Sequence, residues 1–233
     1  MCAGMPSRPL VSPAAGAARA TVIVFCRAPQ IGAVKSRLAR DVGRLRAWRF
    51  YRHCLEGLLA EAEDRRWRLL LAVTPDRLGP GFRLFAGSAR ILPQGRGDLG
   101  RRMRAALRAA GTGPVVLVGA DIPQLERRHL LDALAVLRRA DAVFGPADDG
   151  GYWLVGLRAP WRHRALFDGV RWSGPHALAD TLASLAPGSR VGFVEELTDV
   201  DTLADLRGLR AAQRSSRRGI SSAKLQGRKR MSS

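Results

Sequence analysis

Short apolar runs alternate with amphipathic stretches along most of this chain. The runs are rich in β-branched residues, as buried strands are, and they occupy residues 21–26, 68–74, 89–92, 115–118, 141–144, 152–157 and 190–194. Apolar residues at helical spacing mark residues 35–63, with a break near Gly43, and residues 98–110, 130–137, 175–185 and 202–213. This alternation predicts an α/β fold built from βαβ units, with a mostly parallel mixed sheet centred on the strand at 115–118.

The pattern predicts one domain over residues 21–213. No internal repeat and no second compositional regime interrupts it, and 233 residues suffice for one substantial core. Residues 1–20 are rich in Ala, Pro and Arg without a continuous apolar core, which predicts a disordered leader and not a secretory signal. Residues 214–233 are basic and contain no acid, which predicts a disordered tail.

The composition is that of an ordinary globular protein, with 46% hydrophobic and 25% charged residues. No apolar run is long enough to span a bilayer, and three scattered cysteines fit the reducing cytoplasm and offer no zinc spacing. The net charge of +19 suggests nucleic acid, but the arginines are spread over helical stretches without interleaved aromatics. Nucleic acid is therefore not favoured as the main partner, and the sequence indicates no oligomeric state.

Asp121 is the most informative residue of the chain. It follows the strand at 115–118 and two small residues, and Pro123 fixes the direction of the chain beyond it. Open α/β sheets bind ligands at the carboxyl ends of their strands, and Mg²⁺ prefers one or two carboxylates together with substrate oxygens. We therefore expect Asp121 to hold a divalent metal, Mg²⁺ or Mn²⁺, on a phosphate. The alternative is that Asp121 merely caps the next helix.

A basic loop follows the first strand. Arg27, Lys35 and Arg37 surround the flexible Gly32 at the start of a predicted helix, where cations and free N–H groups together make a phosphate cradle. The spacing is neither that of a Walker A loop nor that of a dinucleotide-binding fingerprint. The alternative is an ordinary basic helix start on the surface.

A polar segment follows the third strand. Gln94 is suited to reading a base edge, and Gly95 lets a flat ring or a ribose approach the backbone. Asp98 and Leu99 open the next helix, which Asp98 is also suited to cap.

Two acidic segments come later in the chain. Asp149, Gly150, Gly151 and Tyr152 form either a simple hairpin turn or the wall of an acceptor site, in which Asp149 accepts a proton and Tyr152 offers an aromatic face. Because neighbouring parallel strands end on the same side of a sheet, we expect this turn to lie beside the metal-binding strand. Asp201, just before the last predicted helix, is either a second metal carboxylate or a cap.

Taken in order, these segments resemble the bacterial family of rSAM/selenodomain-associated transferases. The resemblance runs from about residue 21 to residue 207 and rests on the motifs Arg27-x-Pro29-x-x-Gly32-x-x-Lys35-Ser-Arg37-Leu38, Gln94-Gly95-x-x-Asp98-Leu99-Gly100-x-Arg102-Met103, Gly119-Ala-Asp121-Ile-Pro123, Asp149-Gly-Gly-Tyr152-Trp-Leu-Val-Gly156 and Asp199-Val-Asp201-Thr202. That family belongs to the GT-A-like nucleotide-diphospho-sugar transferase superfamily, in which some members are named arsenosugar-biosynthesis glycosyltransferases and others are nucleotidyltransferases.

The resemblance implies a GT-A-like, Rossmann-type three-layer sandwich and a metal-dependent transferase with a nucleotide-activated donor and a small-molecule acceptor. It also implies roles for individual residues. Those on the donor nucleotide are Arg27, Gly32, Lys35 and Arg37 at the phosphates and Gln94, Gly95, Asp98 and Leu99 at the base and ribose. Asp121 and Asp201 would bind Mg²⁺ or Mn²⁺, and the acceptor side would be lined by Asp149, Gly150, Gly151 and Tyr152. We name Lys35 and Asp149 as the candidate catalytic residues. The chain departs from the glycosyltransferase Asp-x-Asp signature, because Asp121 stands alone in its motif.

The reaction itself stays open at this point. The lone Asp121 and the Lys35-Ser-Arg37 loop favour nucleotidyl transfer with release of pyrophosphate, whereas the family naming favours glycosyl transfer with release of a nucleoside diphosphate. We rank glycosyl transfer first. A domain that binds a nucleotide without turning it over is a third hypothesis.

Overall fold

The computed structural model describes residues 19–77, 82, 87, 89–160, 163–198, 202–205 and 207–208. Within these ranges the labelled elements follow one another as β1 (Thr21–Arg27), α1 (Ser36–Val42), α2 (Arg44–Ala62), β2 (Arg68–Thr74), β3 (Arg90–Pro93), α4 (Leu99–Ala109), β4 (Val115–Gly119), α5 (Arg127–Val136), β5 (Ala142–Pro146), β6 (Tyr152–Leu157), α6 (Ala177–Ala183) and β7 (Val191–Phe193). Each predicted strand is present, and α1 and α2 meet at Gly43, where the sequence predicted a break.

One seven-stranded sheet forms the centre of the fold, in the order β3-β2-β1-β4-β6-β5-β7. Its neighbouring strands pair in parallel except at β6, which runs antiparallel to both β4 and β5. The mostly parallel mixed sheet with β4 at its middle is therefore confirmed. The strand before the Asp149 turn, β5, runs in the same direction as β4 and ends at the same edge, as expected, but the two strands are not neighbours, because β6 is inserted between them.

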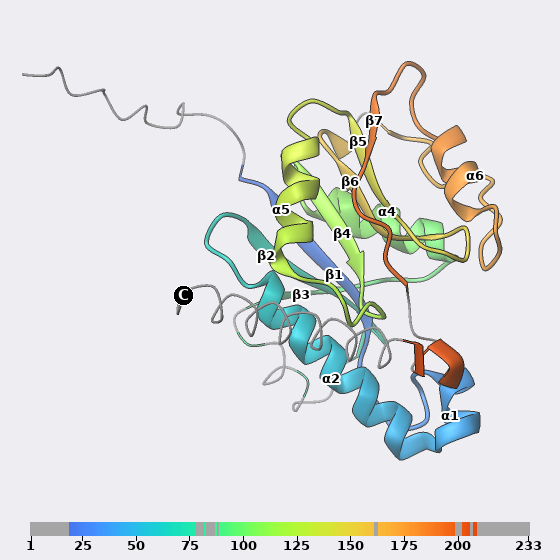
Figure 1. The fold of residues 1–233 in the computed structure, drawn as a ribbon. Coiled ribbons are helices and arrows are strands. Elements are labelled where there is room, and N and C mark those ends of the chain that lie inside the picture. The colour runs from blue at the N-terminus through green and yellow to red at the C-terminus, as the bar shows by residue number, and fades with distance from the viewer. Residues whose placement is uncertain are drawn as a thin grey trace, which may run out of the picture.

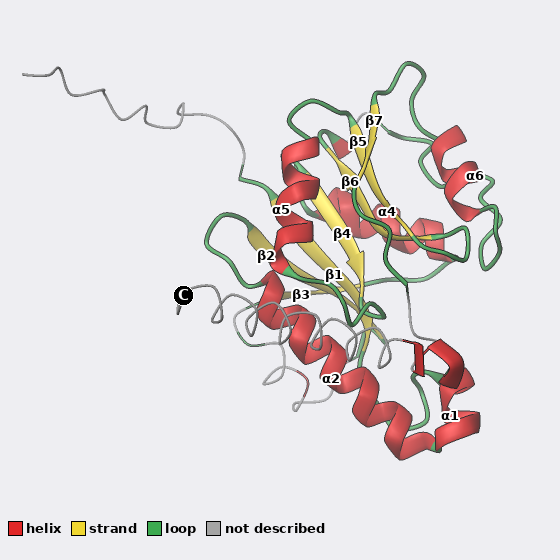
Figure 2. Ribbon diagram, viewed as in Figure 1, coloured by secondary structure: helices red, strands yellow, loops and turns green. Residues whose placement is uncertain are grey.

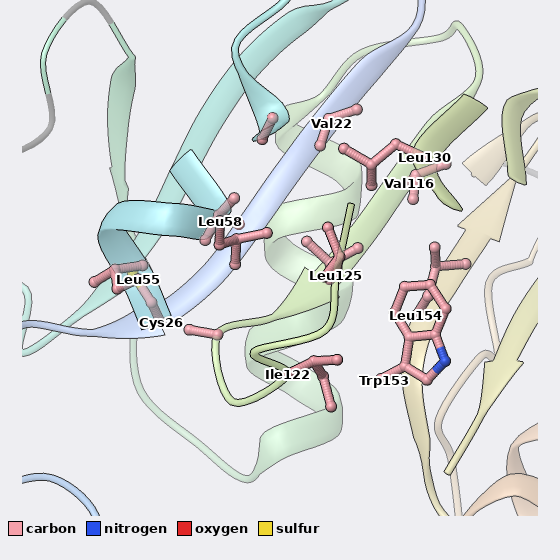
Figure 3. Packing of buried hydrophobic residues seen from close by; sticks show 14 of the residues in the cluster. Val22, Cys26, Leu55, Leu58, Val116, Ile122, Leu125, Leu130, Trp153 and Leu154 are labelled. Carbon is pink, nitrogen blue, oxygen red and sulfur yellow. The ribbon is translucent and has the colours of Figure 1, made fainter. Parts of the chain in front are cut away.

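Helices cover both faces of this sheet, so the fold has three layers (Figures 1 and 2). Helices α2 and α5 pack on one face, where alternate strand residues such as Val24 and Val118 are fully buried beneath Leu55 and Leu130. Figure 3 shows the close packing of this layer. Helices α4 and α6 cover the opposite face and bury the other set of alternate residues. This burial of both faces explains why the strands read as continuous apolar runs.

The sheet register aligns the carboxyl ends of the central strands. Phe25 of β1 lies opposite Gly119 of β4, and Arg27 lies opposite Thr74 of β2. The antiparallel strand β6 begins at this same edge, with Tyr152. Among the described helices, none is long and apolar enough to cross a membrane.

Candidate functional site

A cavity of about 790 Å³ opens at the edge where β1, β2 and β4 end and β6 begins. Its lining includes side chains from both faces of the sheet, from the loop between β1 and α1, and from the first turns of α4. The charged members are four basic side chains and two carboxylates: Arg27, Lys35, Arg37, Arg102, Asp98 and Asp121. The excess of positive charge suits an anionic ligand.

The centre of the charged lining is an ion pair between Lys35 and Asp121. Lys35 Nζ lies 3.0 Å from Asp121 Oδ1. The Lys35 side chain is 4% exposed, whereas the Asp121 side chain is 49% exposed. The ammonium is thus held away from water by a carboxylate that still faces the cavity.

The backbone of Lys35 explains how its side chain reaches this position. Lys35 precedes the first residue of α1 and adopts the left-handed conformation, with φ 49° and ψ 50°. A residue with a Cβ atom rarely adopts this conformation, so the surrounding structure must hold it in place. The turn directs the side chain inward from the loop instead of along the surface of α1.

Asp121 does not cap the following helix. Helix α5 begins only at Arg127, and Glu126 occupies its N-cap position. The capping alternative for Asp121 is therefore excluded. The carboxylate lies just beyond the end of β4, in the loop that precedes α5.

Neutral buried groups surround the ion pair. Burial, and next the nearby Asp121 carboxylate, raise the pKa of the Cys26 thiol to about 12. Burial also raises the pKa of Cys54 to about 11, against the lowering influence of the Lys35 ammonium. Burial is the main cause that raises the pKa of Tyr51, followed by the neighbouring Cys26 and Asp121. These groups keep their protons at neutral pH, so the negative charge beside Lys35 belongs to Asp121.

Tyr51 fixes the carboxyl end of β1. Its hydroxyl accepts the backbone N–H of Arg27 and donates to the backbone oxygen of the same residue, both at 2.9 Å. Three residues earlier on α2, Trp48 donates from Nε1 to the oxygen of Pro29 at 2.7 Å. Helix α2 therefore holds the start of the basic loop through side-chain hydrogen bonds. The sequence analysis did not find these residues, because their spacing on α2 indicated only core packing.

Gln94 is buried at the floor of the cavity, with 2% exposure. Its amide nitrogen Nε2 donates to the backbone oxygens of Cys26 and Ala72, both at 2.9 Å. Its amide oxygen accepts from Arg102 Nη1 at 3.0 Å. Both amide hydrogens are thus bonded to strand backbone. The amide therefore has no free donor for the predicted hydrogen bond to a base edge.

Asp98 caps helix α4, as the sequence analysis expected for its structural role. Its Oδ1 accepts the backbone N–H of Arg101 at 2.7 Å. Leu99 follows as the first residue of α4 and lines the cavity beside it. Gly95 does not line the cavity, and its N–H donates to Asp76 Oδ1 at 3.1 Å.

Aromatic side chains close the side of the cavity near β6. Tyr152 and Trp172 both line it. The Tyr152 ring packs edge-to-face on Phe144, with centroids 5.5 Å apart, and its hydroxyl lies 3.3 Å from Thr181 Oγ1. The polar tip of Tyr152 is thus engaged with α6. The aromatic wall predicted after β5 is present at the start of β6.

The Asp149 turn is a hairpin between β5 and β6. Ala147 and Gly151 are hydrogen-bonded across it at 3.1 Å, and Asp149 Oδ1 accepts the N–H of Gly151 at 2.8 Å. Asp149 is exposed and, like Gly150 and Gly151, does not line the cavity. An acceptor bound in the cavity would have to extend beyond Tyr152 to reach this carboxylate.

The structure thus brings together most of the predicted site residues at one edge. Those that line the cavity are Arg27, Lys35, Arg37, Gln94, Asp98, Leu99, Asp121 and Tyr152. Gly32 lies in the same loop with φ 82° but outside the lining. Asp199 and Asp201 lie outside the described residues. Arg102, which was part of a quoted motif without a role, is an additional cavity residue.

The described residues offer one carboxylate suited to a divalent metal. No group of three or more His, Cys, Asp or Glu side chains that could hold an ion occurs among them. Asp121 nevertheless fits a metal that is shared with a substrate, because its carboxylate is half exposed and faces a cavity lined by cations. The predicted second ligand, Asp201, lies outside the described ranges.

A comparison with known families and curated proteins gives one match. Residues 58–174 match the family described as uncharacterized proteins conserved in bacteria, DUF2064. No curated protein sequence matches the chain.

Solved structures share the fold. One is a protein from Desulfovibrio desulfuricans G20 that is provisionally designated a nucleotide-diphospho-sugar transferase. It has 30% sequence identity to this chain and a TM-score of 0.70, and the match covers 79% of this chain and 83% of that chain. A CMP:2-keto-3-deoxy-manno-octonic acid synthetase in complex with CTP has 13% identity and a TM-score of 0.55, with 85% and 100% covered. A 4-diphosphocytidyl-2C-methyl-D-erythritol synthase from Anaerococcus prevotii DSM 20548 has 12% identity and a TM-score of 0.56, with 84% and 96% covered.

These similarities confirm the predicted three-layer fold of nucleotide-diphospho-sugar transferases. The two synthetases are too distant in sequence to bear on anything but the fold. The resemblance is thus confirmed at the level of the fold and the superfamily, while the finer grouping with rSAM/selenodomain-associated transferases stays a prediction.

Proposed function

We propose that this chain, which belongs to the DUF2064 family of bacterial proteins, is a metal-dependent transferase that acts on a nucleotide-activated donor. Glycosyl transfer from a nucleotide-diphospho-sugar is the first candidate reaction. The 30% identity to a protein designated a nucleotide-diphospho-sugar transferase supports ranking glycosyl transfer ahead of nucleotidyl transfer.

The observation that carries the proposal is that Arg27, Lys35 and Arg37 line one cavity together with Asp121, at the carboxyl edge of the sheet, where Lys35 and Asp121 form an ion pair. A diphosphate brings several negative charges, which a cavity with more cations than carboxylates can balance. Open α/β sheets place ligands at this edge. An ordinary basic helix start would leave the Lys35 side chain in solvent, whereas this side chain is 4% exposed.

The residues of the chain have separate tasks in this proposal. Arg27 and Arg37 bind the diphosphate, and Lys35 places a fixed positive charge beside the bond that breaks. Asp121 would hold Mg²⁺ or Mn²⁺, with Asp201 as a possible second ligand, and the bound metal would neutralise charge that develops on the leaving group. Tyr152 offers an aromatic wall to the acceptor, and Asp149, on the exposed hairpin beyond it, is proposed to accept a proton or a hydroxyl hydrogen bond from an acceptor that extends past Tyr152.

Nucleotidyl transfer is the second candidate, and the position of Lys35 favours it. An ammonium that is buried beside a single carboxylate is suited to stabilise charge on an attacked α-phosphorus. In that reaction the acceptor oxygen bonds to the α-phosphorus and pyrophosphate leaves, whereas in glycosyl transfer the acceptor bonds to the sugar carbon and a nucleoside diphosphate leaves.

Analysis of the released product tests the proposal. The full chain is incubated with Mn²⁺ and a panel of nucleoside triphosphates and nucleotide sugars, each with a mixture of hydroxyl-bearing small molecules as acceptors. Release of a nucleoside diphosphate from a nucleotide sugar is the expected result, and release of pyrophosphate would select the second candidate. Binding of nucleotide without any product would instead favour a domain that binds without turnover and would overturn the proposal.

A further inference from the structure

Arg102 on the α4 wall of the cavity has an unusual environment. It lines the cavity and is partly buried, and its Nη1 donates to the Gln94 amide oxygen at 3.0 Å. Its Nε is shielded from solvent and has no hydrogen-bond partner. A buried donor without a partner is uncommon in native proteins and calls for an explanation.

The absence of a counter-ion distinguishes Arg102 from comparable groups. Three other buried nitrogen atoms in the described part of the chain also lack a hydrogen bond, but each belongs to a side chain with a carboxylate near it: Arg104 with Asp168, His129 with Glu195, and Arg158 with Asp141. Arg102 forms no ion pair with any carboxylate of the described residues. No carboxylate in the described ranges therefore pairs with its positive charge at the wall of the cavity.

Gln94 fixes Arg102 without neutralising it. The Gln94 side chain is immobilised because its amide nitrogen donates to two strand oxygens, so only its oxygen is presented to the guanidinium. A neutral amide oxygen orients an arginine but leaves its net charge in place. A glutamate at the same position would cancel that charge. The arrangement keeps Arg102 both rigid and cationic.

The neighbouring Arg101 shows the ordinary surface alternative. Its side chain is 77% exposed, its backbone N–H donates to Asp98, and its Nε lies 3.8 Å from Asp98 Oδ2. The carboxylate of Asp98, at the N-cap of α4, is therefore directed to Arg101. Arg101 and Arg102 differ in environment but not in chemistry, so Arg101 provides a matched control.

We propose that Arg102 binds a carboxylate or phosphate group of a substrate, at an anion subsite on α4 that is distinct from the basic loop, and that Gln94 is its positioning residue. The inference rests on the proposed function, which assigns the donor diphosphate to the loop of Arg27, Lys35 and Arg37. The planar guanidinium suits bidentate binding of such groups. A nucleoside carries no further anion, so the group belongs either to an acidic acceptor or to an acidic sugar of the donor.

Titration with inorganic phosphate tests the subsite. The full chain is first saturated with Mg²⁺ and a nucleoside diphosphate, and phosphate is then added in a calorimeter. We expect phosphate to bind the parent protein and Arg102→Met to weaken this binding on the order of tenfold to a hundredfold, the range for a hydrogen bond to a charged group. Arg101→Met should bind phosphate as the parent does.

Gln94→Met tests the positioning role. We expect it to weaken phosphate binding, and to cause no further loss when combined with Arg102→Met, because the amide acts only through the guanidinium. Independent losses in the double variant would contradict this role. Should Gln94→Met fail to fold, the comparison of Arg102→Met with Arg101→Met still decides the existence of the subsite.

Three results would overturn the inference. The first is that Arg102→Met binds phosphate as well as the parent does. The second is that the nucleoside diphosphate excludes phosphate, which would assign Arg102 to the diphosphate site. The third is that Arg102→Met changes only which nucleoside base is preferred. If no nucleoside diphosphate binds the parent protein, the proposed function fails, while Arg102-dependent phosphate binding without nucleotide would still support the subsite.

Nucleotide sugars distinguish the two sources of the anion. Two donors are compared that share a base but carry either a neutral sugar or a uronic acid. Phosphate that binds alongside both donors indicates an acidic acceptor. Phosphate that is displaced only by the uronic acid donor indicates an acidic sugar.

Discussion

Asp121→Asn should destabilise the protein, in addition to any effect on metal binding. The substitution is nearly isosteric but leaves the Lys35 ammonium, whose side chain is 4% exposed, without the carboxylate that lies 3.0 Å from it. Breaking a fully buried ion pair from one side costs about 3–5 kcal/mol, and an exposed pair contributes at most about 1 kcal/mol. Because the Asp121 side chain is 49% exposed and screened by water, we expect a loss of roughly 1–3 kcal/mol between these limits.

Thermal unfolding measures this loss. For a domain of this size each kcal/mol corresponds to about 2–4 °C, so the Tm of Asp121→Asn should fall by roughly 2–12 °C. Lys35→Met replaces the ammonium with an apolar chain of similar length and leaves a half-exposed carboxylate, so it should cost much less. The double variant should therefore be more stable than Asp121→Asn alone. A Tm for Asp121→Asn equal to that of the parent, or additive losses in the double variant, would refute the reasoning.

Three further results are expected. Asp149→Ala should slow turnover and leave the affinity for the donor nucleotide within a few fold, which steady-state kinetics and nucleotide titration would show; lost nucleotide binding would contradict its placement on the acceptor side. Gly100→Ala should lower stability by about 1–3 kcal/mol and disturb the fluorescence of Trp172, because an added Cβ would lie 3.0 Å from the Trp172 ring. The free energy of unfolding should fall as the pH rises from about 9 towards 12, because the unfolded chain releases the Cys26 and Cys54 protons at lower pH than the native protein does. A free energy of unfolding that does not change over this pH range would contradict the burial of these thiols.

The sequence predicted most of the fold because the central strands are buried on both faces and read as short apolar runs. The exception is the place of β6. Its apolar run resembles that of a parallel strand, and only the Asp149 turn indicated that it pairs as a hairpin with β5. The structure has the hairpin, and Tyr152 directly after it lines the cavity, so the two interpretations of this segment do not exclude each other. The insertion of β6 beside β4 depends on pairing between distant segments, which local pattern does not determine.

The candidate site was predictable where a residue follows a strand directly. Asp121 and Arg27 were found in this way, because the carboxyl ends of parallel strands meet at one edge. The ion pair of Lys35 with Asp121 was not predicted, since it depends on the left-handed backbone of Lys35 and joins distant parts of the chain. Arg102 was hidden by the abundance of arginine in α4, and only its environment distinguishes it from Arg101.

Nucleotide titration in the presence of Mn²⁺ tests the central claim most directly. The parent protein and Arg27→Ala are titrated with the diphosphates of adenosine, guanosine, cytidine and uridine in a calorimeter. The account predicts that at least one of them binds the parent protein, that Mn²⁺ strengthens its binding, and that Arg27→Ala weakens it severalfold or more. Failure of all four to bind, or binding that neither Mn²⁺ nor Arg27→Ala changes, would contradict the placement of a metal-bound diphosphate in this cavity.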